Sequence, residues 1–530
     1  MHSAVRILQL GIAAFVCVAV LYTTKCVCQL LAFWITSLPT LIWTQGFGSH
    51  SGPQAHGTGR LATQADIFAH LDPNAYALLS NGVYRSDPAF APVVGTIDYD
   101  PAGLRQKLLG DSDMNSTVSL SQDTLLSKAF SQSLHPTRII PYFYRATGKF
   151  DDDDVTITTL VTSNRFKVLK QLVERYRGPI SVTIHIPFPS ATTLADLPPD
   201  SPSLTVLHDL HDLYHSTPHF GNYVDVHLAL SPFSGKAHND RSASHSKDKG
   251  DGEGGRQFNV WRNVARLFSR TEFVMMLDVD FAVCTDWRGA VRRAMKDAHA
   301  NDVGIARRSG GISADKEGRT SEVANSLREG SAALVLPVFE YISQEDGEDQ
   351  RTFPQDKESL LRLVNTKPPI ITSFHASWAP GHNSTNYPKY YSIPPGADKI
   401  YKVETYQSSY EPYVITSKWV TWCDERFTGY GANKAACLFE MYLSGVSFYV
   451  LSDHFLIHQN HKYEEEARRE ERKYNRKLYT DFKEEACLRY LYRFHHEGTL
   501  DSPKGSNVKA ECKKIKSVTK IAAELLGVTL

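Results

Sequence analysis

The sequence predicts an α/β fold, in which a largely parallel sheet is layered against helices, and three observations support this class. Strand-like segments alternate along the chain with segments whose apolar residues recur at helical spacing. One complete strand–helix–strand unit lies within residues 155–186. A third observation is the wholly apolar segment Phe273–Leu277, which is typical of a strand buried on both faces of a sheet.

The first strand–helix–strand unit is predicted from its residue pattern. Residues 155–162 alternate apolar side chains with threonine, as a strand does. Apolar residues then recur at helical spacing from Phe166 to Tyr176, and Gly178-Pro179 is expected to end that helix. Residues 180–186 are the second strand. Such a unit is right-handed and its two strands are parallel.

The same alternation continues downstream. We expect further strands at residues 224–230, 273–277, 332–338 and 455–457, and helices at residues 260–268, 287–300, 353–364 and 434–444. Residues 234–255 are rich in Ser, Gly, Asp, Lys and His and are predicted to be a disordered insertion. Residues 380–397 are predicted to be a long loop, and residues 463–493 a solvated amphipathic helix.

The composition excludes some classes of function. Lys plus Arg and Asp plus Glu number 58 each, so the net charge of zero gives no reason to expect a nucleic-acid partner. The glycine-rich motifs of dinucleotide-binding and P-loop proteins are missing, and so is the nucleophile elbow of α/β-hydrolases.

The N-terminal segment predicts attachment to a membrane. Residues 7–24 are largely apolar, Lys25 interrupts, and residues 27–43 are apolar again. A cleavable signal peptide is the competing interpretation, but the apolar character continues well past a plausible cleavage point. We therefore expect an uncleaved signal anchor, a short cytoplasmic tail and a luminal body. The glycosylation sequons at Asn115 and Asn383 agree with a luminal body.

The expected organisation has four parts. These are a cytoplasmic tail and anchor, a stem, one catalytic-sized domain that contains the insertion, and a C-terminal tail, at residues 1–43, 44–150, 151–495 and 496–530. Beyond the membrane segment, the cysteines have no zinc-site spacing, and we expect one or two disulfides among Cys284, Cys423, Cys437, Cys487 and Cys512.

Two carboxylates, Asp278 and Asp280, follow directly after the buried strand at 273–277. The end of a buried strand has no structural use for two acids unless something positive meets them there. A divalent cation is the simplest partner, and hard oxygen ligands suit Mg²⁺ or Mn²⁺. A solvated strand end with stray acids is the structural alternative.

A second cluster lies at the end of the predicted strand 455–457. His458 follows this strand, and His461 and Lys462 come close behind. A neutral imidazole is able to complete an oxygen-rich Mn²⁺ shell, and a lysine to neutralise a phosphate. The structural alternative is a polar loop whose histidines only form hydrogen bonds.

Two further clusters carry polar side chains of the kind that bind sugars and phosphates. Asp424 and Glu425 stand among aromatic residues and glycines, where an acid is able to deprotonate an acceptor hydroxyl. A tight turn leading into the helix at 434–444 is the alternative. Arg262 and Arg266 are spaced to share one face of the helix at 260–268, and arginine suits phosphate.

In this order the four clusters resemble glycosyltransferase family 49, which includes LARGE-like and β-1,4-glucuronyltransferase-like enzymes. The matching segments are NVWRNVARLFSRTEFVMMLDVDF, CDERFTGYGANK and FLIHQNHK, within residues 155–495. The resemblance implies a GT-A fold, that is, a Rossmann-like domain that binds a nucleotide sugar at the carboxyl ends of its strands. It also implies an inverting, Mn²⁺-dependent (or Mg²⁺-dependent) enzyme, anchored in the Golgi or endoplasmic reticulum membrane as a single-pass type II protein.

The resemblance also implies roles for individual residues. Asp278 and Asp280 would bind the metal and the UDP diphosphate, with His458 or His461 as a further metal ligand. The nucleotide would be bound by Arg262, Asn263, Arg266 and Lys462, and Asp424 or Glu425 would be the base at a glycan or glycoprotein acceptor. Glucuronate is the sugar that the family suggests. The alternative is a catalytically inactive, carbohydrate-binding relic of a transferase.

Overall fold

The computed structural model describes residues 137–188, 197, 198, 200–231, 256–302, 314–461 and 465–530. The predicted anchor at residues 1–43, nearly all of the predicted stem, the insertion at 234–255 and Lys462 lie outside the described residues. In the part of the chain that is described, no helix has the length and apolar character needed to cross a bilayer.

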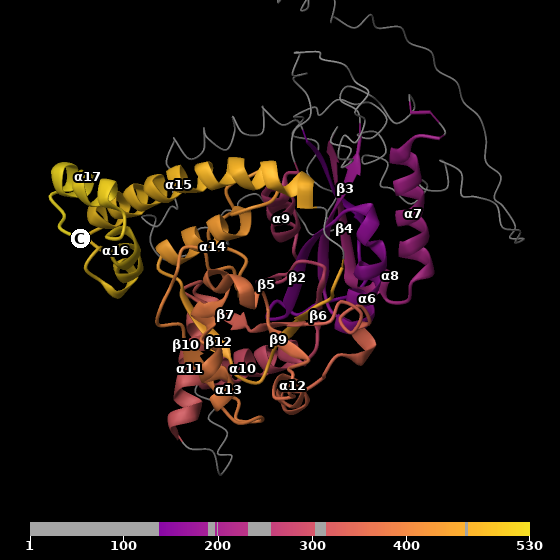
Figure 1. Ribbon diagram of the computed structural model, residues 1–530, viewed down its shortest axis with the longest axis horizontal. Coiled ribbons are helices and arrows are strands. Elements are labelled where there is room, and N and C mark those ends of the chain that lie inside the picture. The colour runs from indigo at the N-terminus through magenta and orange to yellow at the C-terminus, as the bar shows by residue number, and fades with distance from the viewer. Residues whose placement is uncertain (1–136, 189–196, 199, 232–255, 303–313, 462–464) are drawn as a thin grey trace, which may run out of the picture. The chain divides into compact units, whose positions relative to one another are not determined.

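A nine-stranded mixed sheet forms the centre of the described chain (Figure 1). Its strand order is β1-β4-β3-β2-β5-β11-β7-β12-β10. The strands β2 to β5 are parallel to one another, whereas β11 is antiparallel to both of its neighbours. The strands are β1 Arg138–Tyr144, β2 Val155–Val161, β3 Ile180–Pro187, β4 Val224–Ser231, β5 Phe273–Met276, β7 Ala332–Leu336, β10 Ile400–Lys402, β11 Tyr413–Ser417 and β12 Ser447–Leu451.

A four-stranded sheet, in the order β6-β13-β8-β9, lies beside the end of β5. Its strands are β6 Phe281–Val283, β8 Val338–Tyr341, β9 Ile371–Ser373 and β13 Leu456–His458. Because β13 pairs antiparallel with β6, His458 lies opposite Phe281, directly after the predicted acidic pair. The small sheet therefore brings the predicted histidine cluster to the end of β5.

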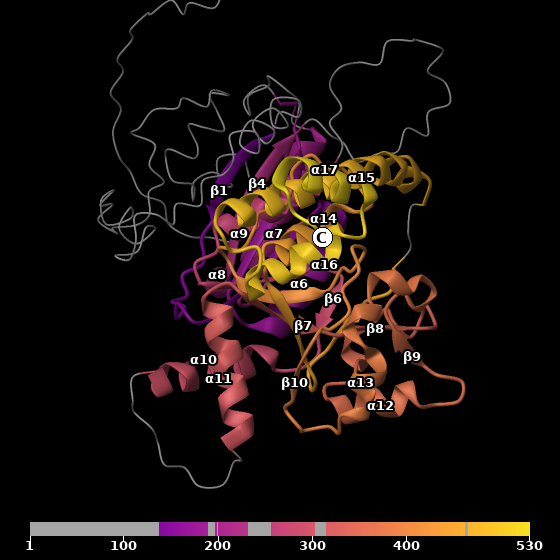
Figure 2. The same cartoon turned by 90° about the vertical axis from the view of Figure 1, so that its left-hand side faces the viewer.

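Helices cover both faces of the large sheet (Figures 1 and 2). Alternate residues of β3 show this, since Val182 and Ile184 share a core with α6 and α7, whereas the hydroxyls of Ser181 and Thr183 donate to backbone carbonyls of α9. The first helices are α6 Phe166–Tyr176, α7 Pro202–Ser216, α8 Phe220–Tyr223, α9 Phe258–Leu267, α10 Trp287–Asp302 and α11 Ala314–Arg328.

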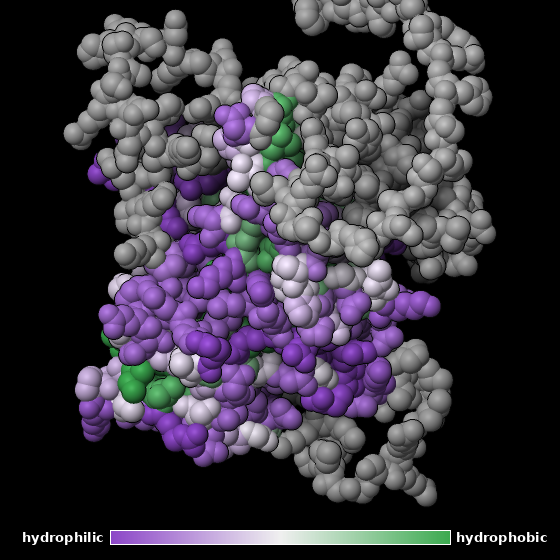
Figure 3. Space-filling model, turned by 90° about the vertical axis from the view of Figure 1, so that its right-hand side faces the viewer, coloured by the Kyte–Doolittle hydropathy of each residue, from purple (hydrophilic) through white to green (hydrophobic). Residues whose placement is uncertain are grey.

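The C-terminal half adds a second core beneath the long helix α15. Helix α14 is buried along most of its length, and α15 covers it with one apolar face that includes Phe482, Leu491 and Phe494. The described surface on the face shown in Figure 3 is mostly hydrophilic. The helices here are α12 Lys357–Val364, α13 Tyr387–Ser392, α14 Asn433–Leu443, α15 Glu465–His496, α16 Ser506–Cys512 and α17 Lys516–Leu526.

The predicted α/β class is confirmed, and so are the helix 166–176 and the parallel pairing of the strands on either side of it. Some segments differ from expectation. Strand β1 belongs to the sheet although it falls in the predicted stem, α13 lies inside the predicted 380–397 loop, and the predicted C-terminal tail contains α16 and packs against α15. Apolar packing and a disulfide between Cys487 and Cys512 hold this tail against α15.

A buried histidine fastens β1 to the sheet. Tyr142 has a positive φ of 50° at an irregularity in β1, and its backbone N–H donates to Nδ1 of His227 in β4 over 2.9 Å. The other ring nitrogen of His227 bonds the hydroxyl of Ser181 at 3.0 Å. Since Nδ1 accepts a hydrogen bond, this imidazole is neutral, and burial lowers its pKa to about 3.

We predict that the protein loses stability as pH falls below about 6.5, the ordinary histidine pKa. The unfolded chain then takes up protons that His227 and the similarly buried His185, with a pKa lowered to about 4, do not bind in the folded state. Each such group removes up to about 1.4 kcal/mol per pH unit. Chemical denaturation between pH 7 and pH 5 measures this slope. His227→Gln should flatten it, whereas His496→Gln, at an exposed site on α15, should leave it unchanged.

Candidate active site

Asp278 and Asp280 lie where the central strand β5 leaves the sheet. β5 is flanked by the parallel strand β2 and the antiparallel strand β11. The end of β5 therefore meets the carboxyl end of β2 and the amino end of β11. A turn follows, in which the N–H of Phe281 donates to the carbonyl of Asp278 over 3.1 Å. This turn directs the two aspartates into different surroundings.

Asp278 is surrounded by hydrogen-bond donors and positive charge. The hydroxyl of Tyr413 donates to it over 2.7 Å, and Lys434 and Arg262 form ion pairs with it at 3.4 and 3.3 Å. The side chain is 35% exposed. Burial alone would raise the pKa of this carboxyl, but Lys434, Arg262 and the tyrosine hydroxyl together hold the pKa well below its ordinary value. Asp278 is therefore a stable anion.

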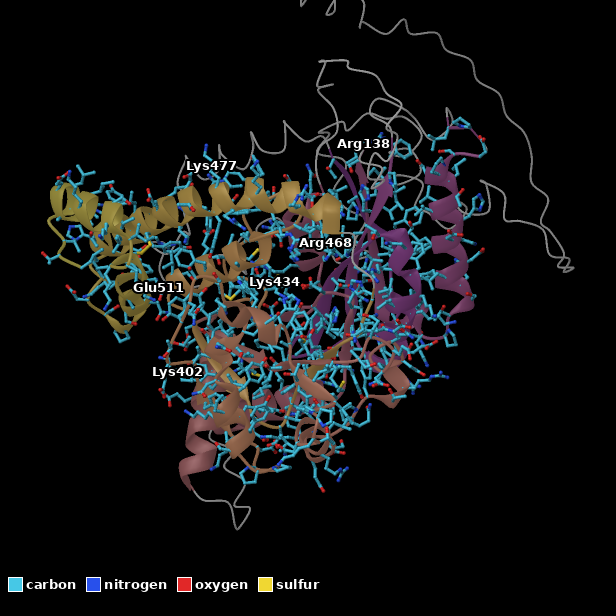
Figure 4. The ribbon with its side chains drawn as sticks, in the orientation of Figure 1. Arg138, Lys402, Lys434, Arg468, Lys477 and Glu511 are labelled. Atoms are coloured by element: carbon cyan, nitrogen blue, oxygen red, sulfur yellow. A yellow bond between two sulfur atoms is a disulfide. The ribbon has the colours of Figure 1, made fainter. Side chains whose placement is uncertain are left out.

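Two of these partners were not predicted from the sequence. Tyr413 begins β11, a strand that the sequence analysis did not expect. Lys434 lies in the first turn of α14, and its ammonium also sits 3.3 Å from the centre of the Tyr413 ring. Burial lowers the pKa of Lys434, an effect that Asp278 opposes. Figure 4 shows Lys434 among the side chains between α14 and the strands.

Glu411, another acid that the sequence analysis did not single out, lies two residues before Tyr413. Its backbone N–H donates to the carbonyl of Gly381 over 2.9 Å. Burial raises the pKa of Glu411, and the charges of Lys434 and Asp278 act on it in opposite directions. A partly buried carboxyl with a raised pKa therefore lies within electrostatic reach of Asp278.

Asp280 has a sparser environment. Its Oδ1 has no hydrogen-bond partner among the described residues and lies 3.5 Å from the guanidinium of Arg165. Its Oδ2 lies 3.4 Å from Nε2 of His461. The side chain is 21% exposed. Arg165, which the sequence analysis did not consider, also bonds Nδ1 of His461 at 2.9 Å.

The residues near Asp280 fit a divalent metal whose remaining ligands are phosphate oxygens or water. No group of three or more His, Cys, Asp or Glu side chains converges to hold a metal within the described residues. Asp280 and His461 are close enough to share one ion, and the ring of His458 lies 5.4 Å from that of His461. Burial lowers the pKa of His458 to about 4, so the imidazole is neutral, as a metal ligand must be. Mg²⁺-type sites commonly combine one or two protein ligands with phosphates and water.

The two predicted arginines of α9 lie in different environments. Arg262 bonds Asp278 and the side chains of Asn259 and Asn433. Arg266 is buried and donates to the backbone carbonyls of Lys418, Val420 and Thr421. Its guanidinium also stacks on Trp422 at 4.0 Å. These three hydrogen bonds of Arg266 are thus all directed to the loop that follows β11.

Asn263 fastens that same loop. Its side chain donates to the carbonyl of Cys423 over 2.8 Å and accepts from the N–H of Cys423 at 3.0 Å. It also donates to Glu425 over 2.9 Å. The disulfide between Cys423 and Cys437 then ties the loop to α14. The structure thus brings Asn263 to one of the predicted acids, Glu425.

The two predicted catalytic acids also differ. Asp424 is buried, and both of its oxygens accept hydrogen bonds from the guanidinium of Arg426. Arg426 is also paired with Glu485 of α15 at 2.7 Å. Glu425 is only partly buried. Asp424 thus forms an ion pair with Arg426 that holds the loop against α15. The catalytic role of either acid stays a prediction.

Comparison with known proteins identifies the family. The model of glycosyltransferase family 49, described as "Glycosyl-transferase for dystroglycan", matches residues 154–491. The chain belongs to this family. The family predicted from the four sequence clusters is therefore confirmed, and with it the predicted enzyme class, a glycosyltransferase.

Individual relatives are more distant. The chain is 22% identical to human xylosyl- and glucuronyltransferase LARGE1 over 376 residues, which cover 69% of this chain and 40% of LARGE1. It is 25% identical to rat LARGE2 over 58% of this chain and 34% of that protein. The chain thus spans less than half the length of these relatives. Staphylococcus aureus TarS aligns with a TM-score of 0.28 at 9% identity, over 70% of this chain and 72% of that structure. This score is too low to support an argument.

Replacing Arg262 and Arg266 one at a time should distinguish an arginine that binds ligand from one that stabilises the fold. Arg266→Met leaves three carbonyls without their donor and should lower the free energy of unfolding by about 3 kcal/mol. Arg262→Met, at the partly exposed Asp278, should cost less stability and weaken UDP binding about tenfold. Thermal unfolding and calorimetry with UDP measure the two effects. Equal losses of stability in both variants would contradict this assignment.

Proposed function

We propose that the chain is a metal-dependent, inverting glycosyltransferase that transfers a sugar from a UDP-sugar to a glycan acceptor. The single observation that carries this proposal is the end of β5, where Asp278 meets Lys434 and Arg262 and Asp280 lies beside His461. A GT-A arrangement fits this geometry, because ligands of α/β sheets bind at the carboxyl ends of parallel strands. Glucuronate and xylose are candidate sugars, since LARGE1 and LARGE2 are named for both.

We assign the metal to Asp280 and His461, with His458 as a further ligand. A bound Mn²⁺ or Mg²⁺ would supply positive charge to the departing diphosphate. Asp278 would hold Lys434 and Arg262 in place at the edge of the site. These cations are fixed before any ligand arrives, so they would neutralise phosphate charge without reorganising. Lys462 stays a predicted phosphate ligand.

The base has two candidates. Glu425 remains from the sequence analysis, because Asp424 is engaged by Arg426. Glu411 is the candidate that the geometry adds, since it lies within electrostatic reach of Asp278 and its raised pKa favours proton uptake. An inverting transferase needs one such carboxylate to take the proton from the acceptor hydroxyl.

We also propose a luminal location in the Golgi or endoplasmic reticulum, with a type II membrane anchor at residues 1–43. Two observations support an oxidising, glycosylating compartment. Two disulfides join Cys423 to Cys437 and Cys487 to Cys512, and the sequon residue Asn383 is exposed.

The proposal predicts release of UDP from one member of a panel of UDP-sugars, in the presence of Mn²⁺ and not with a chelator. Asp280→Asn should lower this turnover at least about 100-fold while the thermal unfolding temperature stays unchanged. Asp297→Asn, at an exposed position on α10, is the matched control and should be fully active.

Two results would contradict the proposal. Full turnover by the Asp280→Asn variant would exclude the metal assignment. An absence of turnover and of UDP binding with every sugar tested would favour the alternative, a carbohydrate-binding relic of a transferase.

A single substitution at each candidate base, Glu411 and Glu425, distinguishes between them. Glu411→Gln should lower kcat about 100- to 10,000-fold, because amide side chains accept no proton, with little change in the KM for the donor. Glu425→Gln should then have a much smaller effect. The reverse order of the two losses would assign the base to Glu425.

A further inference from the structure

We propose that Arg165 competes with the metal ion for Asp280 and His461, so that metal binding requires this guanidinium to be displaced. Arg165 ends the short 3₁₀ helix Ser163–Arg165 that follows β2. Because β2 and β5 are parallel neighbours, with Thr158 opposite Met276, the segment after β2 lies beside the end of β5. The inference rests on the proposed metal-dependent function.

The three side chains form a closed set of contacts. Nη1 of Arg165 lies 3.5 Å from Oδ1 of Asp280, and Nη2 lies 2.9 Å from Nδ1 of His461. Nε2 of His461 lies 3.4 Å from Oδ2 of Asp280. All three side chains are largely buried, with 24%, 21% and 14% of their surfaces exposed for Arg165, Asp280 and His461. A positive group thus already faces both residues that are assigned to the metal.

The hydrogen bond between Arg165 and His461 makes the competition direct. Arginine only donates hydrogen bonds, so Nδ1 of His461 is the acceptor, and a proton on Nε2 would face Asp280. A metal ligand must be an unprotonated nitrogen. A metal at Nδ1 would replace the guanidinium, and a metal at Nε2 would move the proton to Nδ1, where it would face Arg165. Either mode of ligation breaks the contact between Arg165 and His461.

Asp280 is suited to exchange one cation for another. Its Oδ1 has no hydrogen bond in the described structure, and the nearest guanidinium nitrogen is 3.5 Å away, beyond the usual distance for a charge-assisted bond. Asp278, in contrast, is held by three partners. A guanidinium released from Asp280 would remain near the diphosphate and is a good phosphate ligand. Metal and nucleotide should therefore bind with positive coupling.

The test is Mn²⁺ binding to the full-length chain, followed by the electron paramagnetic resonance signal of free Mn²⁺, without and with UDP. Arg165→Gln should bind Mn²⁺ about tenfold more tightly than wild type without UDP. UDP should also enhance Mn²⁺ binding less in this variant. Arg362→Gln, which removes an exposed arginine from α12, is the matched control for loss of charge and should behave as wild type.

A double variant separates direct competition from a general effect of charge. In the His461→Ala background, Arg165→Gln should tighten Mn²⁺ binding less than in wild type, because only the contact between Arg165 and Asp280 then remains. An undiminished effect there would overturn the competition at His461. Arg165→Lys keeps the charge but not the two-pronged donor, and serves if Arg165→Gln fails to fold. It should tighten binding to a smaller extent, and affinity equal to wild type would overturn the inference.

Failure of this inference is distinguishable from failure of the proposed function. Equal Mn²⁺ affinity in wild type and Arg165→Gln, together with loss of binding in Asp280→Asn, would overturn the role of Arg165 and leave the metal site intact. No Mn²⁺ binding by any variant, with or without UDP, would overturn both.

Discussion

The site depends on how two carboxylates are compensated at the end of one buried strand. Isolated charges cannot remain in partly buried surroundings without partners. Asp278 obtains a hydroxyl and two cations from β11, α14 and α9, and Asp280 obtains Arg165 and His461 from the segments that follow β2 and β13. The hydrogen bonds and ion pairs of these two carboxylates thus bring together segments that are far apart in the sequence.

A second network holds the surrounding loop in place. Buried polar side chains of α9 bind the backbone of residues 418–424, and a disulfide joins Cys423 to α14. The loop therefore has the partners of an interior segment although it has no regular secondary structure. Asn263 and Arg266 are residue types that often bind phosphate, but in this structure their hydrogen bonds hold the loop in place.

The sequence predicted the local features well and the long-range ones poorly. Helix 166–176, its flanking strands and the position of Asp278 and Asp280 follow from periodicity within a few residues. Tyr413, Lys434 and Arg165 were missed as site residues because their proximity comes from the pairing of distant strands, in particular the antiparallel insertion of β11 beside β5. Arg262 and Arg266 are indistinguishable by spacing, and only the loop that packs on them separates their roles.

The two aspartates, one residue apart, are made unequal by the turn after β5. A hydrogen bond from the N–H of Phe281 to the carbonyl of Asp278 reverses the chain between them. Asp278 consequently remains against the sheet, where Tyr413, Lys434 and Arg262 already bind its carboxylate. Asp280 is carried toward the small sheet, where one of its oxygens has no hydrogen bond. A carboxylate that only positions Lys434 and Arg262 keeps all of its partners, whereas the proposed metal ligand needs an oxygen that an incoming cation could reach. The turn gives neighbouring positions of one motif these two different surroundings.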